Sequence, residues 1–226
     1  MNSLNMKIEP YANLQGANLR GANLQGAYLK GVDFQVAYLQ GAYLQGAKLQ
    51  GAYLQRAYLK GADLREANFQ GANLQWAVLK EADLQGANLQ GAYLQGAYLQ
   101  GAYLQGANLK EANLQGAYLQ GAYLPHFQIV PSEGSFIGWK KTTKGVIRVF
   151  IPPDAERTSS LVSRKCRASR VVPLDEGGES PTYKGKLSYK KGVAVYADKF
   201  DPDIRLDCTH GIHFFMTKQE AEEWMI

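Results

Sequence analysis

The stretch GAYLQGAYLQGAYLQGANLK, residues 91–110, repeats nearly the same five letters four times. The period reaches far beyond this stretch, because a leucine or phenylalanine recurs at every fifth position from Leu14 to Leu124, 23 times without a gap. Alanine stands two residues before each of them, with Val32 as the single exception. A five-residue period spreads around an α-helix and alternates between the faces of a flat strand, so neither element buries these side chains together.

A chain that turns a corner once every five residues does bury them together. Alanine and leucine then point inward, the other three residues point outward, and successive coils pair edge to edge at about 4.8 Å. Glycine fills most positions two after the leucine, which is typical of a corner with positive φ. The pattern predicts a solenoid with a filled, narrow interior. Six corner residues depart from glycine: Val36, Arg56, Glu66, Trp76, Glu81 and Glu111.

The segment ANLQGANLRGANLQGAYLK, residues 12–30, resembles the pentapeptide-repeat proteins, whose A(D/N)LXX pattern covers 115 of the 226 positions. The resemblance implies a mainly β fold: a right-handed quadrilateral β-helix with four pentads per coil. The 23 pentads then make about six coils, roughly 28 Å long at the strand spacing.

Four pentads per coil stack residues that are 20 apart, and this arithmetic sorts the outward side chains into columns. Val36, Arg56 and Trp76 form one column, in which Arg56 is expected to lie against the Trp76 indole as a cation–π pair. One face carries a tyrosine column with Tyr38, Tyr58, Tyr98 and Tyr118. A second face has Tyr43, Tyr103 and Tyr123, and a third is largely amide, with Asn68, Asn88 and Asn108.

Three interpretations of the solenoid compete. Tyrosine, tryptophan and arginine are enriched at interface hot spots, so the tyrosine column with Arg56 and Trp76 predicts a rigid platform for a protein partner, with a homodimer as an alternative. In the second interpretation the tyrosines serve only to pack on one another. Some pentapeptide-repeat proteins mimic DNA and inhibit topoisomerases, which over this length requires about 16 negative charges. The repeats carry 8 basic and 6 acidic residues, which disfavours DNA mimicry, and nucleic acid is not expected as a partner of the repeats.

The composition changes after residue 130, where the pentad ends and charges and turn residues increase. We expect an N-terminal cap at 1–10, the β-helix at 11–125, a plug and linker at 126–130 with Phe127 and Ile129 at core positions, and a small α+β domain at 131–226. Residues 145–151, 169–174 and 192–197 are predicted strands. Thr217 and Glu220 form a capping-box signature that predicts a short terminal helix.

Three blocks of this second domain resemble a small domain found behind pentapeptide repeats in phages, large DNA viruses and bacteria. The blocks are GSFIGWKK, IPPDAERTSSLVSRKCRAS and CTHGIHFFMTKQEAEEW. That family has no established activity, so the resemblance assigns no catalytic residue. We therefore expect a non-catalytic interaction protein that uses no cofactor.

Two clusters keep alternatives open. A weak metal site or a Cys–His nucleophile is conceivable from Cys166, Cys208, His210 and His213, although the spacing favours ordinary core residues. A patch for an anionic ligand is the alternative to a solvated basic face for Lys140, Lys141, Arg164, Lys165, Arg167 and Arg170.

Localisation follows from what the composition lacks. Two cysteines are too few for a disulfide framework, the first residues do not read as an export leader, and no run of about 18 apolar residues occurs. With a mild net charge of +5, the sequence favours a cytoplasmic protein without a membrane span.

Overall fold

The computed structural model describes residues 8–127, 129–181 and 187–224. The chain divides into two compact units, residues 1–126 and 127–226. Over the described residues, no helix is both long and apolar enough to cross a membrane.

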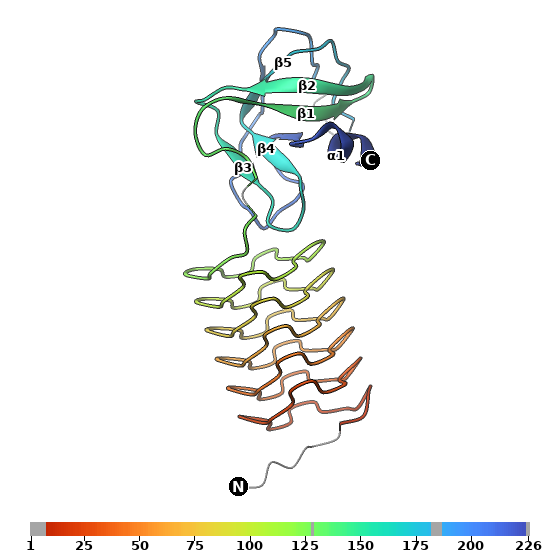
Figure 1. Cartoon of the computed structure of the whole chain (residues 1–226), viewed down its shortest axis with the longest axis vertical. Helices are drawn as coiled ribbons and strands as arrows, with labels where there is room; N and C mark the ends of the chain where they lie inside the picture. Colours follow the sequence, from red (N-terminus) through yellow and green to blue (C-terminus); the bar gives the residue numbers. More distant parts are fainter. Residues whose placement is uncertain (1–7, 128, 182–186, 225–226) are drawn as a thin grey trace. The chain divides into compact units, whose positions relative to one another are not determined.

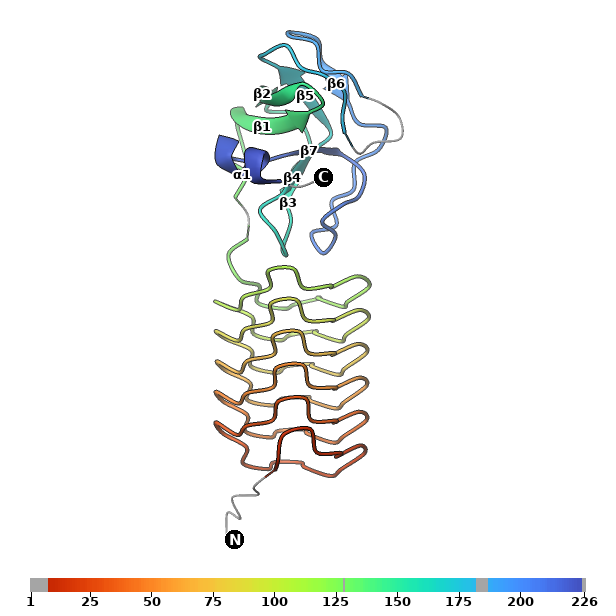
Figure 2. The same ribbon diagram turned by 90° about the vertical axis from the view of Figure 1, so that its right-hand side faces the viewer.

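The first unit is a β-helix in which parallel bridges join residues 20 apart, from Asn13 with Asp33 to Tyr103 with Tyr123. Figures 1 and 2 show the resulting stack of similar coils. Three backbone hydrogen bonds per pentad connect neighbouring coils, as in Asp33 N to Ala12 O (2.9 Å), Leu14 N to Asp33 O (2.8 Å) and Gly16 N to Gln35 O (2.9 Å). The repeat therefore satisfies its main-chain groups by stacking, as the sequence predicted.

The corners adopt the left-handed conformation that the glycine pattern predicted. Corner glycines have φ near +65°, for example 63° at Gly41 and 66° at Gly96. The six non-glycine corners have the same conformation, with φ between 57° and 61°. Their side chains are therefore accommodated despite a backbone that L-residues rarely adopt.

A local hydrogen bond explains why asparagine and aspartate recur at the outward position before the leucine. The side chain at that position accepts a hydrogen bond from the backbone N–H two residues later, as Asn88 Oδ1 does from Gln90 N at 3.1 Å. All eleven asparagine and aspartate residues at this position make this contact. It is an Asx turn that supports the corner.

The interior of the solenoid is filled by the alanine and leucine columns. Every leucine or phenylalanine of the repeat from Leu19 to Leu114 is buried, and Phe34 and Phe69 are fully enclosed. Burial weakens at both ends, where Leu14 and Leu124 are partly exposed. Most of the predicted N-terminal cap lies outside the described residues.

The second unit is mostly β, with two small sheets and one short helix. The first sheet has the order β1-β2-β5-β6, formed by Phe136–Thr142, Gly145–Ile151, Arg170–Pro173 and Val195–Tyr196. The second has the order β3-β4-β7, formed by Arg157–Ser159, Cys166–Ala168 and Ile212–Phe214. All pairings between these strands are antiparallel, and an isolated bridge from Trp139 to Phe215 connects β1 with the chain after β7.

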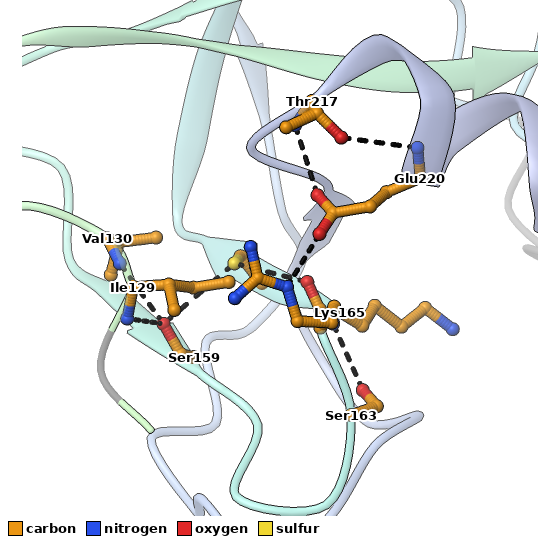
Figure 3. Close-up of polar contacts among 9 residues, drawn as sticks. Ile129, Val130, Ser159, Ser163, Lys165, Thr217 and Glu220 are labelled. Carbon is orange, nitrogen blue, oxygen red and sulfur yellow. Dashed lines mark hydrogen bonds and ion pairs between the residues drawn. The ribbon is translucent and has the colours of Figure 1, made fainter. Parts of the chain in front are cut away.

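The predicted strands at 145–151 and 169–174 are confirmed within one residue, whereas only Val195–Tyr196 of the third forms a strand. Helix α1 (Lys218–Glu223) begins with the predicted capping box. Figure 3 shows Thr217 Oγ1 accepting from Glu220 N, while the Glu220 carboxylate accepts from Thr217 N.

The expected plug at the end of the solenoid is wrong for Ile129. Its side chain packs against the core of the second unit, and its backbone N–H donates to Ser159 Oγ at 3.0 Å. Val130 N–H donates to the same oxygen, as Figure 3 shows. This apolar segment is therefore part of the hydrophobic core of the second unit.

Candidate functional site

The predicted tyrosine column exists as two stacked pairs. Tyr38 and Tyr58 have ring centroids 5.1 Å apart and an interplanar angle of 4°, and Tyr98 and Tyr118 have values of 4.9 Å and 4°. Val78 occupies the position between the pairs and bridges to both Tyr58 and Tyr98 through its backbone. We call Tyr38, Tyr58, Tyr98 and Tyr118 the tyrosine ladder. Because the valine side chain is short and has no ring, one ring is missing from this ladder.

A shallow groove of about 440 Å³ lies at this missing ring. It is lined by Arg56, Tyr58, Trp76, Val78 and Tyr98. The indole of Trp76 remains 50% exposed. It lies flat over the neighbouring coil at Gly96, since a Cβ atom there would come within 2.5 Å of the ring. The corner column thus forms one wall of the groove, because glycine at position 96 leaves room for the indole.

Cations surround the ladder. The Arg20 guanidinium lies 4.4 Å from the Tyr38 ring centroid, and Lys80 Nζ lies 5.8 Å from that of Tyr98. The expected cation–π contact between Arg56 and Trp76 is not formed in the described solenoid. Lys60, at the edge of the same face, forms an exposed ion pair with Glu81 at 3.6 Å. Arg56 makes no ion pair with any described residue, so the groove carries a positive charge.

The other faces differ from this one. Tyr103 stacks on Tyr123 at 4.8 Å on the second tyrosine face. On the amide face, Asn108 Nδ2 donates to Asn88 Oδ1 at 3.3 Å. A groove flanked by two ring pairs is therefore a property of the Val78 face.

The second unit contains a partly open pocket of about 310 Å³. Lys140 from β1 and Lys165, just before β4, line it together with His213 from β7 and Tyr189. Apolar walls come from Leu187, Ile212, Phe215 and Trp224. Figure 3 shows the Lys165 side chain extending away from Ser159 and Ile129.

Both pocket lysines are buried, with exposed fractions of 6% at Lys140 and 5% at Lys165. Lys140 Nζ donates to the His213 carbonyl at 3.0 Å and lies 5.1 Å from the Tyr189 ring centroid. Lys165 Nζ lies 2.9 Å from Cys208 Sγ and 3.7 Å from the Trp224 ring centroid. Burial, with a smaller effect of the Lys165 charge, lowers the pKa of Lys140 to about 8. Neither ammonium forms an ion pair with any of the described residues.

Two neutral polar groups share this environment. Burial and then the Lys165 charge lower the pKa of His213 to about 3, so its imidazole is neutral at physiological pH. Its Nε2 is buried and has no hydrogen-bond partner among the described residues. Burial raises the pKa of Tyr189, whose hydroxyl likewise lacks a partner of good geometry in that part of the chain.

The remaining predicted basic residues have structural partners. Lys141 Nζ donates to the backbone oxygen of Trp224 at 2.6 Å, although Lys141 also lines the pocket. Arg164 pairs with Glu220 at 2.6 Å, and Arg170 pairs with Asp154. Arg167 is 1% exposed and donates to three backbone carbonyls, those of Asp201, Asp203 and Leu206. The sequence cluster therefore separates, and Lys140 and Lys165 are the two that converge with unsatisfied charge.

The four weak metal candidates do not come together. Cys166 is fully buried, with its Sγ 3.9 Å from Ser159 Oγ, and burial raises the pKa of its thiol to about 12. His210 Nδ1 lies 3.4 Å from Asp198 Oδ2, outside the pocket that His213 and Cys208 line. Across the described residues, no three histidine, cysteine, aspartate or glutamate side chains are placed to hold a metal ion.

Sequence reasoning missed Val78 and Tyr189. Val78 is the one aliphatic residue at the outward position before the leucine, which is a visible signal for a gap in the tyrosine column. Tyr189 lies far from the pocket lysines in sequence, and only the tertiary fold brings these residues together.

Two family models match the chain. One, described as pentapeptide repeats in eight copies, matches overlapping segments from residue 12 to residue 125. The other, described as a family of unknown function (DUF5758), matches residues 126–221. No curated protein matches the chain significantly.

Several solved structures are similar to the chain. A pentapeptide-repeat protein, Rfr23, from the cyanobacterium Cyanothece is 35% identical, with 50% of this chain and 84% of that one covered and a TM-score of 0.38. A pentapeptide-repeat protein of the Arabidopsis thaliana thylakoid lumen is 31% identical over 48% of this chain and 70% of that one, with a TM-score of 0.37. HetL from a Nostoc strain, involved in heterocyst differentiation regulation, is 36% identical over 50% and 63%, with a TM-score of 0.25.

Proposed function

Because the chain belongs to the pentapeptide-repeat family over residues 12–125 and carries the DUF5758 domain over 126–221, we propose that it is a non-catalytic recognition scaffold. In this proposal the solenoid is a right-handed, four-sided β-helix, with 23 pentads in about six coils. It binds a protein partner through the Val78 face and acts in the cytoplasm.

The observation that carries the proposal is the gap in the tyrosine ladder. Stacked rings on this face are about 5 Å apart, and at Val78 no ring stands between Tyr58 and Tyr98, although Lys80 Nζ lies 5.8 Å from the Tyr98 ring centroid. An aromatic side chain of a partner fits into such a gap, because offset stacking between rings favours this separation. The exposed Trp76 indole adds a second aromatic contact surface.

The tyrosines are not required by the geometry of the coil. Asparagine or aspartate at the same position accepts a hydrogen bond from the following corner, and tyrosine gives up that Asx turn. Ten tyrosines at this position therefore replace a locally favourable residue with a large aromatic surface. Partner binding supplies a reason for that replacement.

Charge complementarity defines the partner further. Arg56 lines the groove without an ion pair among the described residues, and Lys80 lies against the ring of Tyr98, which also lines it. An acidic side chain beside the inserted ring would complement these cations. The proposed partner is therefore a protein segment in which an aromatic residue lies next to an aspartate or glutamate.

The test is selection from a random peptide display library on the full chain. Enriched peptides should combine an aromatic with an acidic residue, and they should lose binding to Val78→Tyr, which fills the gap with a ring. Asn88→Tyr, at the equivalent position of the amide face, is the matched control and should leave binding unchanged.

Two results would overturn the proposal. Peptides without an aromatic preference, or peptides that bind Val78→Tyr as well as the parent chain, would rule out insertion into the ladder. Self-association that Val78→Tyr abolishes, measured by analytical ultracentrifugation, would identify the occupant as a second copy of this chain.

A further inference from the structure

The lysine-lined pocket of the second unit shares no residue with the groove of the solenoid. Its main feature is two buried ammonium groups without a carboxylate against either of them in the described residues. Burying a charge without a counterion is unfavourable, so an arrangement of this kind is stabilised by an anion from outside the chain. We propose that the pocket binds the phosphate group of a small organic phosphate monoester.

Hydrogen-bonding capacity supports an anion at this place. An ammonium group has three N–H donors. Lys140 uses one of them on the His213 carbonyl, and Lys165 directs one to the Cys208 sulfur. The remaining donors of both lysines have no acceptor among the described residues and are available to phosphate oxygens. Charge-assisted bonds of this type are about twice as strong as neutral ones.

The contrast with Arg167 shows that buried cations of this domain are normally satisfied. The Arg167 guanidinium is buried as deeply as the two lysines, yet three backbone carbonyls accept from it. A structural cation therefore has its partners within the fold. Among the described residues, Lys140 has one such carbonyl and Lys165 has none, so both ammonium groups keep donors for a ligand.

Two neutral groups complete the polar part of the pocket. The buried His213 Nε2 has no hydrogen-bond partner among the described residues, and the Tyr189 hydroxyl, near Ser180, has none of good geometry there. A phenol donates to a phosphate oxygen, and a neutral imidazole nitrogen accepts from a protonated one or donates in its other tautomer. Both groups line the pocket beside the two lysines and are available to the same anion.

Charge and size select a monoester. Two ammonium groups match the charge of about −1.5 to −2 that a phosphate monoester carries at neutral pH, whereas a single carboxylate leaves one lysine uncompensated. The volume of about 310 Å³ exceeds that of a phosphate group and lies in the range of small-molecule sites. Leu187, Phe215 and Trp224 offer apolar walls to the organic part of the ligand.

Calorimetric titration of the full chain with phenyl phosphate tests the proposal. Phenyl phosphate should bind. Inorganic phosphate and benzoate should each bind at least about tenfold more weakly than phenyl phosphate, and phenol should show no binding. Lys165→Met and Lys140→Met should each reduce affinity at least about tenfold. Lys190→Met changes the net charge equally at an exposed position of the same domain and should leave affinity unchanged.

The pH dependence of phenyl phosphate binding, measured first on the parent chain, is a second test. The titratable and charged groups that face Lys140 in the pocket are Lys141, Lys165, Tyr189, Cys208 and His213. Lys140 has a pKa of about 8, while phenyl phosphate stays dianionic above neutral pH. Affinity should therefore fall as the pH rises from 7 to 9, approaching about tenfold per unit, and Lys140→Met should remove this dependence.

Folding of the variants is checked by near-UV circular dichroism and by the unfolding midpoint without ligand. Lys140→Met should keep or raise the midpoint, because it removes a buried uncompensated charge. A lowered midpoint for Lys140→Met would assign Lys140 a structural role and overturn the proposal. No binding of phenyl phosphate to the parent chain, or equal binding of phenol, would overturn it as well.

Discussion

At the scale of single residues, the corner positions accept side chains other than glycine, but at a conformational cost. Val36, Arg56 and Trp76 have φ values of 57° to 59°, the region that favours glycine. A left-handed conformation costs about 1–2 kcal/mol for an L-residue, and a β-branched side chain is the least suited to it. Val36 is therefore the most strained of the three corners.

Replacing Val36 by glycine should stabilise the solenoid. Relief of the left-handed conformation exceeds the entropy that glycine adds to the unfolded chain, so we expect a gain of about 0.5–1 kcal/mol in the free energy of unfolding. Urea titration followed by circular dichroism measures this change.

Gly41→Val is the converse control. Gly41 lies at an equivalent corner with φ of 63°, and an added Cβ meets no atom within 4 Å. The substitution should cost about 1–2 kcal/mol through the backbone alone. If Val36→Gly and Gly41→Val both had the same free energy of unfolding as the parent chain, the corners would tolerate glycine and valine equally.

At the scale of elements, Arg167 of β4 secures the chain that leads from the first sheet to β7. Its guanidinium donates to the carbonyls of Asp201, Asp203 and Leu206. Arg167→Met should destabilise the second unit by about 3 kcal/mol or more, because these buried acceptors lose their donors together. Denaturant unfolding monitored by the fluorescence of Trp139 and Trp224 reports the loss.

Arg170→Met, at the start of β5, is the comparison for that prediction. Arg170 pairs with Asp154, whose side chain is 69% exposed. Exposed pairs contribute about 0–1 kcal/mol, so the loss should be small. Similar effects of the two substitutions would contradict a structural role specific to Arg167.

The elements also show what could be predicted from the sequence. The period of five fixes the solenoid, because one inward leucine per corner has a single compatible geometry, and the 20-residue bridges confirm the columns. The strand at 145–151 is confirmed because its β-branched residues alternate between faces. A gap such as that at Val78 follows once the columns are known.

The pocket was not predictable, because it depends on contacts between distant segments. Pairing of Arg167 with His213 joins β4 to β7 across more than forty residues, and no local pattern specifies it. Lys140 and Lys141 look alike in the sequence, yet strand alternation directs Lys140 inward. Predicting which of the two lysines points inward requires knowing which face of β1 is buried, and the local sequence does not indicate this.

At the scale of the whole molecule, two compact units should unfold in separate transitions. The solenoid is held by contacts between neighbouring coils, and the second unit has its own hydrophobic core. Differential scanning calorimetry should resolve two transitions. Val36→Gly should shift only one of them, and Arg167→Met should shift only the other.

The control for this prediction is phenyl phosphate, which should raise only the transition that Arg167→Met lowers, because a ligand stabilises the unit that binds it. A single transition that both substitutions shift would show that the units unfold cooperatively. Tryptophan fluorescence can assign the transitions, because Trp76 lies in the first unit and Trp139 and Trp224 lie in the second.

The bridges between residues 20 apart constrain how such a gene can change length. Gain or loss of one pentad by replication slippage keeps every leucine inward, yet it turns all later side chains by one quarter of a coil. Only a change of four pentads restores the original alignment of Tyr58, Val78 and Tyr98. Lineages that vary in repeat number would therefore scramble their outer surfaces while preserving their interiors, unless selection retained whole coils.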